Sequence, residues 1–140
     1  MEFQSCLEKQ RHFLEVFSSF SSQEEKYHYL IDLGRKTPSM PSEERLEEFL
    51  VQGCQSLLYL KVSCSEGRLL IITHSDALIS AGIAFLIAHV YHGEPPEAVF
   101  KCPPRFIQDI GLLTLLSPSR ANGLKSLYQK LQKEAMQWLK

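Results

Sequence analysis

The sequence predicts a single α+β domain in which a small antiparallel sheet packs against helices. Three observations lead to this class. Over most of the chain, apolar residues recur near the helical period. From residue 55 to 64 they instead alternate with polar residues, and a second apolar run covers residues 69–73. No strand patterns alternate with helix patterns along the chain, so a parallel sheet built from βαβ units is not expected.

The composition indicates one core and argues against two classes of partner, nucleic acids and membranes. With 140 residues, 44% of them hydrophobic, the chain has room for one domain, residues 1–140. Its 15 basic and 16 acidic side chains leave a net charge of -1, which provides no basic surface for nucleic acid. Residues 1–5 lack the features of a secretory signal, so a cytoplasmic protein is expected. The longest apolar run, residues 77–91, is shorter than the ~20 residues of a membrane helix.

Two helices are predicted in the first quarter of the chain. Apolar residues recur at helical spacing over residues 3–17, and a serine-rich stretch ends this helix. Ser22 is followed three residues later by Glu25, and the residues at positions 21 and 24 have the same spacing, which is typical of a capping box. We expect Gly34 to end this second helix.

The central part of the chain predicts a loop, a helix and a hairpin. Prolines punctuate residues 35–42, and residues 42–51 are expected to be helical. The alternating segment 55–64 and the apolar segment 69–73 predict two strands, joined by a turn at residues 65–68.

Helices are predicted for the rest of the chain. Ser75 is expected to cap a buried helix over residues 76–91. Short helices are expected at residues 96–99 and 104–110, and Ser117 and Pro118 should open a long final helix. Its predicted inward stripe consists of Leu124, Leu127, Leu131 and Met136.

Cys54 is the candidate reactive residue, because it follows Gly53 at the predicted junction between a helix and a strand. Glycine allows a sharp turn there and leaves the backbone open to a partner. Only a few per cent of a free cysteine with a pKa of about 8.5 is thiolate at neutral pH, so the thiol would need help from its surroundings. From the residues alone, the alternative is a small buried apolar side chain.

The other cysteines and the histidines do not predict a metal site. Neither a zinc ribbon nor a thioredoxin-like motif is expected, because no Cys-x-x-Cys pair occurs among Cys6, Cys54, Cys64 and Cys102. Of the five histidines, His89 and His92 are three residues apart, but no cysteine or carboxylate lies close enough in sequence to complete a site.

Four segments, taken in order, resemble the SufE family of sulfur acceptors. They are Glu24–Tyr27 with Leu30–Gly34, then Val51–Ser56, then Ser75–Ala77 with Gly82, and finally Leu116–Arg120 with Asn122–Leu124. In that family, the cysteine of the Gly-Cys-Gln-Ser motif carries sulfur, and here that residue is Cys54. The resemblance also implies the SufE fold, which is shared with IscU-type scaffolds.

The resemblance implies a sulfur-transfer accessory protein rather than a stand-alone enzyme. Such a protein accepts persulfide sulfur from a SufS-like cysteine desulfurase, stimulates that enzyme, and passes the sulfur to an iron–sulfur cluster scaffold such as SufBCD. It needs no cofactor of its own, because pyridoxal phosphate belongs to the desulfurase. Whether the protein is a monomer or a homodimer is left open.

Seven residues in or beside the matched motifs are candidates for shaping the cysteine loop or docking the desulfurase. They are Gly53, Gln55, Ser56, His74, Ser75, Asp76 and Arg120. For Asp76 the alternative is an ordinary first-turn acid, and for Arg120 an ordinary surface cation. We also expect Cys54 to lie partly shielded near residues 75–77 and Arg120.

The chain departs from the family pattern at two places. Many members carry Val-Trp where this chain has Leu58-Tyr59, and Lys-Gly-Leu where it has Ala81-Gly82-Ile83. Because a basic residue that could contact a partner is missing, we expect a change in affinity for the desulfurase rather than in the chemistry at Cys54. Two other functions stay open: an IscU-like scaffold, which would need three converging cysteines, and an interaction module without chemistry.

Overall fold

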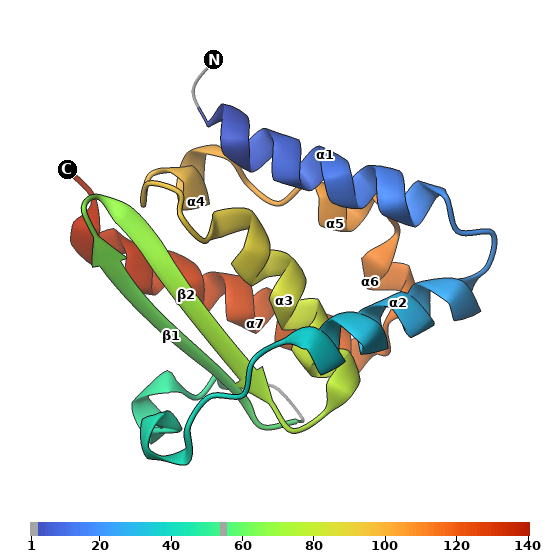
Figure 1. Ribbon diagram of the computed structural model, residues 1–140, viewed down its shortest axis with the longest axis horizontal. Coiled ribbons are helices and arrows are strands. Elements are labelled where there is room, and N and C mark those ends of the chain that lie inside the picture. Colours follow the sequence, from blue (N-terminus) through green and yellow to red (C-terminus); the bar gives the residue numbers. More distant parts are fainter. Residues whose placement is uncertain (1–2, 54–55) are drawn as a thin grey trace.

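The computed structural model describes residues 3–53 and 56–140 and has an α+β architecture, as predicted. A two-stranded antiparallel sheet packs against helices (Figure 1). The helices are α1 Gln4–Ser18, α2 Gln23–Lys36, α3 Leu78–Tyr91, α4 Ala98–Lys101, α5 Phe106–Asp109, α6 Leu112–Leu115 and α7 Pro118–Ala135, with 3-10 turns at Ser42–Glu44, Glu47–Phe49 and Met136–Trp138. The strands are β1 Leu58–Ser65 and β2 Arg68–Ser75.

The hairpin forms as predicted and has one buried face. The strands pair without interruption from Leu58 with Ser75 to Ser65 with Arg68. Glu66 and Gly67 make the turn with φ angles of 52° and 75°, and positive φ at both central residues matches the right-handed twist of a hairpin. Alternate side chains of both strands face the helices and are buried, namely Leu58, Leu60, Val62, Leu69, Ile71 and Thr73.

Helix α3 is the centre of the domain. It contacts β2, α1, α2 and α7, and Figure 1 shows it between the hairpin and α2. Eleven of its 14 residues are buried, which explains why its sequence is apolar on nearly every side. Strand β2 and the helices α1, α2 and α7 are therefore arranged around one buried helix.

The α2–α3 crossing depends on two glycines. A Cβ atom added at Gly34 would collide with the main-chain carbonyl of Leu78, and one added at Gly82 would collide with that of Leu30. Gly34 was expected to end α2, but the helix continues to Lys36. This expectation was wrong, because Gly34 serves close approach between two backbones rather than a turn.

Residues 42–51 do not form the predicted helix. They form two 3-10 turns, after which Leu50 makes an isolated β-bridge with Tyr59 and the Val51 N–H donates to the Leu58 carbonyl at 2.8 Å. Leu46 is 45% exposed. No side chain from residue 42 to 49 is buried, so this part has no apolar face to hold a helix against the core. The last residues extend the hairpin instead, and Val51 joins the core there.

The capping predictions were right at two helices and wrong at a third. Ser22 and Ser117 accept hydrogen bonds from the Glu25 and Arg120 N–H groups, at 3.2 and 3.3 Å. Helix α3, however, begins at Leu78, and Ser75 accepts from the Ala77 N–H in a turn before the helix. Side-chain turns of this kind use the same hydroxyl chemistry as a cap.

Two features of the C-terminal part differ from expectation. Helix α6 was not predicted, because a four-residue helix shows no periodicity. Met136 was expected to face inward but lies beyond the end of α7 and is 59% exposed, whereas Leu124, Leu127 and Leu131 are buried. Among the residues that the structure describes, no helix is long and apolar enough to cross a membrane.

The glycine crossing predicts an unusual sign for one substitution. In a helix interior, Gly→Ala normally stabilises by up to about 1 kcal/mol. For Gly82→Ala we expect a loss of about 1–3 kcal/mol, because the added methyl group forces α2 and α3 apart. Urea unfolding monitored by circular dichroism measures the change. A Gly82→Ala protein that is more stable than the wild type would contradict this account of the crossing.

Candidate functional site

The predicted site centres on the loop between Val51 and Leu58. Cys54 and Gln55 lie outside the described residues, so the site is built from the residues on either side. Gly53 has a φ angle of 81°, a left-handed conformation that side-chain-bearing residues rarely adopt. The glycine before the cysteine is therefore required by the backbone turn, as the sequence indicated.

Helix α7 holds the first end of this loop. The side-chain amide of Asn122 donates to the Gly53 carbonyl at 2.9 Å, across 69 residues of sequence. A Cβ atom added at Gly53 would lie 3.1 Å from the Ser126 hydroxyl oxygen, so the turn runs close against the helix. Asn122 was not among the predicted site residues, although it lies in one of the segments that resemble the family.

Helix α3 holds the second end of the loop. The Ser80 hydroxyl donates to the Ser56 hydroxyl at 3.4 Å. The Ser80 side chain is only 5% exposed. Leu57, which follows Ser56 in the loop, is 52% exposed. The two anchors come from α3 and α7, which also contact the hairpin, and an apolar side chain is exposed just after the second anchored residue.

Arg120 lies in the first turn of α7, close to Ser80. Its Nε atom is buried and has no hydrogen-bond partner among the described residues. It borders a cavity of about 10 Å³ that Ser80 and Leu58 also line, which is close to the smallest space that holds a water molecule. Within the described part of the chain, no carboxylate forms an ion pair with Arg120. A cation with an unused donor therefore lies next to the residues that hold the loop.

His74 and Ser75 face a different neighbourhood. His74 Nδ1 accepts a hydrogen bond from the Met40 N–H at 3.3 Å. Burial, and then the charge of Arg45, lower the pKa of His74, while Asp76 partly opposes the shift. The ring is thus held neutral and turned toward the residue 37–41 loop. Ser75 pairs with Leu58 across the sheet, which brings the end of β2 beside the second end of the cysteine loop.

Asp76 is exposed and forms no ion pair within the described part of the chain. The sequence-predicted residues therefore separate into two groups. Gly53, Ser56 and Arg120 are connected through α3 and α7. His74, Ser75 and Asp76 lie at the end of β2. There Ser75 pairs with Leu58 and His74 with Tyr59, the first two residues of β1.

The described cysteines lie apart from one another, except for one buried pair. Cys64 is opposite Leu69 at the turn end of the hairpin, six residues and roughly 20 Å along β1 from Leu58. Cys6 and Cys102 are buried on either side of the Gln10 amide, and burial raises the pKa of Cys6. Among the described residues, no three His, Cys, Asp or Glu side chains are grouped so as to hold a metal ion.

The chain is similar in fold to a solved structure and similar in sequence to curated proteins. The chain superimposes on a protein of Thermus thermophilus known from its solution structure, with a TM-score of 0.76, 28% identity, and coverage of 92% of this chain and 94% of that one. It is 29% identical over 123 residues to an uncharacterized SufE-like protein of Synechocystis, covering 88% of this chain and 77% of the relative.

A further relative carries a functional name. The chain is 33% identical over 125 residues to the protein named cysteine desulfuration protein SufE in Plasmodium falciparum, covering 85% of this chain and half of the relative's length. The family model described as SufE, an Fe-S metabolism associated domain, matches residues 11–135. Because this match covers most of the chain, the protein belongs to the SufE family.

Proposed function

We propose that this protein accepts sulfur from a cysteine desulfurase on Cys54, stimulates that enzyme, and passes the sulfur to an iron–sulfur cluster scaffold. Membership of the SufE family supports a sulfur-transfer role in iron–sulfur metabolism. The observation that supports the residue assignment is the anchored loop: Asn122 binds Gly53 on one side of Cys54, and Ser80 binds Ser56 on the other. The residues on both sides of the proposed acceptor are thus held by α7 and α3.

The proposed reaction is an exchange between thiols and needs no cofactor on this chain. The desulfurase holds sulfur as a persulfide on its own cysteine. The Cys54 thiolate attacks the outer sulfur atom, a new S–S bond forms at Cys54, and the S–S bond on the desulfurase breaks. The desulfurase cysteine leaves as a thiolate and is free for another turnover, which accounts for stimulation. No net oxidation occurs, because one persulfide is replaced by another.

Arg120 is the residue best suited to help Cys54 ionise. A cation close to a cysteine lowers the pKa of the thiol, because it stabilises the thiolate. The guanidinium group borders the same cavity as Ser80, whose hydroxyl contacts Ser56, two residues after Cys54. Exposed Asp76 and Leu57 are instead suited to contact with the desulfurase.

The described residues do not favour a cluster scaffold. Such a scaffold would need Cys54, Cys64 and Cys102 at one site. Cys64 lies at the far end of the hairpin, and Cys102 is buried where the Tyr91 hydroxyl donates to its carbonyl. A sulfur carrier needs only one accessible thiol.

Replacing the proposed acceptor tests the function directly. For Cys54→Ser we expect no gain of a sulfur atom after incubation with desulfurase and cysteine, because no thiolate remains to attack the persulfide. The desulfurase rate measured with this variant should be lower than with the wild type by about a hundredfold or less, because the desulfurase still turns over cysteine without an acceptor. Intact-protein mass spectrometry and sulfide release measure the two effects. Cys64→Ser serves as the matched control and should behave as wild type; loss of the adduct in that variant instead would show that Cys54 is not the acceptor.

Removing the Arg120 charge should raise the pKa of Cys54. For Arg120→Gln we expect the pH midpoint of iodoacetamide alkylation to shift upward, so that labelling at neutral pH becomes slower than in the wild type. Peptide mass mapping across a pH series reports the rate at Cys54. Lys133→Gln, at an exposed position of the same helix, should leave the midpoint in place. An unchanged midpoint in Arg120→Gln would restrict this residue to packing or docking.

A further inference from the structure

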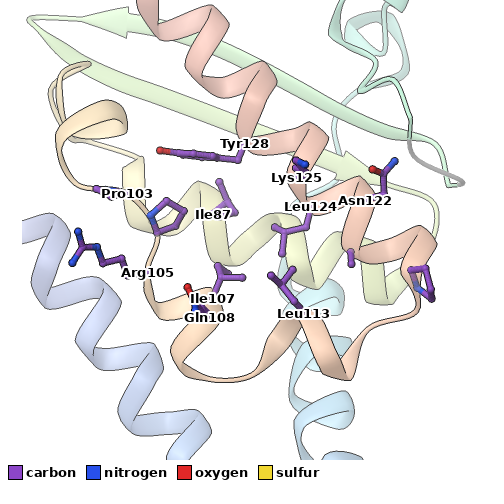
Figure 2. Close-up of a pocket in the computed structure, with 13 residues that line it drawn as sticks. Ile87, Pro103, Arg105, Ile107, Gln108, Leu113, Asn122, Leu124, Lys125 and Tyr128 are labelled. Carbon is purple, nitrogen blue, oxygen red and sulfur yellow. The ribbon is translucent and has the colours of Figure 1, made fainter.

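An apolar groove lies beside the cysteine loop and takes no part in the proposed sulfur exchange. It has a volume of about 610 Å³ and runs between α7 and the segment from Pro103 to Leu113 (Figure 2). Its lining includes Ile87 from α3, Leu124 and Tyr128 from α7, and Ile107 and Leu113 from the opposite wall. The volume lies within the range of functional binding sites, roughly 300–1,000 Å³.

The wall opposite α7 is held in place by hydrogen bonds. The buried Gln10 side chain donates to the Pro103 carbonyl at 3.1 Å and accepts from the Phe106 N–H at 3.4 Å. The Tyr27 hydroxyl donates to the Leu115 carbonyl at 3.0 Å. The groove is therefore preformed, because these hydrogen bonds fix its wall opposite α7.

The groove leaves apolar surface uncovered. Leu113, on α6, lines the groove and is 48% exposed. Figure 2 shows its side chain pointing toward the space that Leu124 borders from above. An apolar side chain left open in a preformed groove is typical of an interaction site.

The charges of the groove are of one sign. Arg105 and Lys125 line it, and among the described residues no aspartate or glutamate does. Neither cation forms an ion pair within the described part of the chain. A complementary occupant is therefore apolar on one side and carries carboxylates next to that side.

The groove is continuous with the cysteine loop. Asn122 lines one end of it and also donates its amide hydrogen to the Gly53 carbonyl. A protein that covers Gly53 and Ser56 to deliver sulfur must therefore also approach Asn122. We infer that the groove docks an amphipathic helix of the desulfurase, with acidic residues facing Lys125 and Arg105; this inference rests on the proposed function.

Other occupants fit the groove less well. Its walls are helices and loops, so it offers no strand edge for an extended peptide to pair with. A second copy of this chain joined through the same surface would bring Lys125 and Arg105 toward their own counterparts, and like charges disfavour such a symmetric contact.

Reversing the charges that line the groove tests the docking surface, and the test measures binding without depending on sulfur transfer. We expect Lys125→Glu and Arg105→Glu each to raise the dissociation constant for the desulfurase by about tenfold or more, measured by calorimetry with the full-length protein. Leu113→Asp should have a similar effect. Lys133→Glu is the matched control, because it makes the same change at an exposed position of α7 outside the groove, and it should stay within about twofold of the wild type. Circular dichroism confirms that each variant is folded.

The outcomes separate this inference from the proposed function. If Lys125→Glu and Arg105→Glu bind like the Lys133→Glu control, the docking inference is overturned even if Cys54 still gains sulfur. If the charge reversals weaken binding but wild-type Cys54 never gains sulfur, the docking surface stands and the sulfur-acceptor proposal fails. A dimer in sedimentation experiments that dissociates in Leu113→Asp would assign the groove to a second copy and overturn the inference.

Discussion

The close crossing of α2 and α3 is the contact on which the rest of the structure depends. Gly34 and Gly82 allow each backbone to approach the carbonyl of the other helix, which brings α3 into the centre of the domain. From there α3 supports the hairpin on one side and α7 on another. Both anchors of the cysteine loop come from these elements, because Ser80 belongs to α3 and Asn122 to α7. The geometry of the site therefore follows from helix packing.

The site combines a supported loop with exposed surroundings. A sulfur acceptor must hold its thiol in a defined place, yet it must also let another protein reach the sulfur atom. The Asn122 amide and the Ser80 hydroxyl hold Gly53 and Ser56, while Leu57, the residue after Ser56, stays exposed. Arg120 adds positive charge without a competing carboxylate among the described residues. The groove along α7 extends the same surface and adds apolar area and two more cations.

Expectations from the sequence were confirmed where a local pattern controls the structure. Strand alternation predicted the hairpin, and the serines at positions 22 and 117 predicted two helix caps. The resemblance to SufE was confirmed by the family match. Expectations failed where burial decides: no side chain from residue 42 to 49 is buried against the core, and Met136 lies beyond the end of α7. Gly34 is a residue type that often ends helices, but here it lets α2 approach the main chain of α3.

The sequence by itself determined the class of fold and the period of the main elements, and it made Cys54 the candidate reactive residue. Those properties depend on neighbouring residues or on a short motif. Only the tertiary structure identified Asn122 and Ser80 as anchors, since their hydrogen bonds join residues 69 and 24 positions apart. It alone revealed the groove as well, whose walls come from α3, α7 and the residue 103–113 segment. Contacts between distant segments form only when the helices pack. The periodicity of residues along the chain therefore cannot predict them.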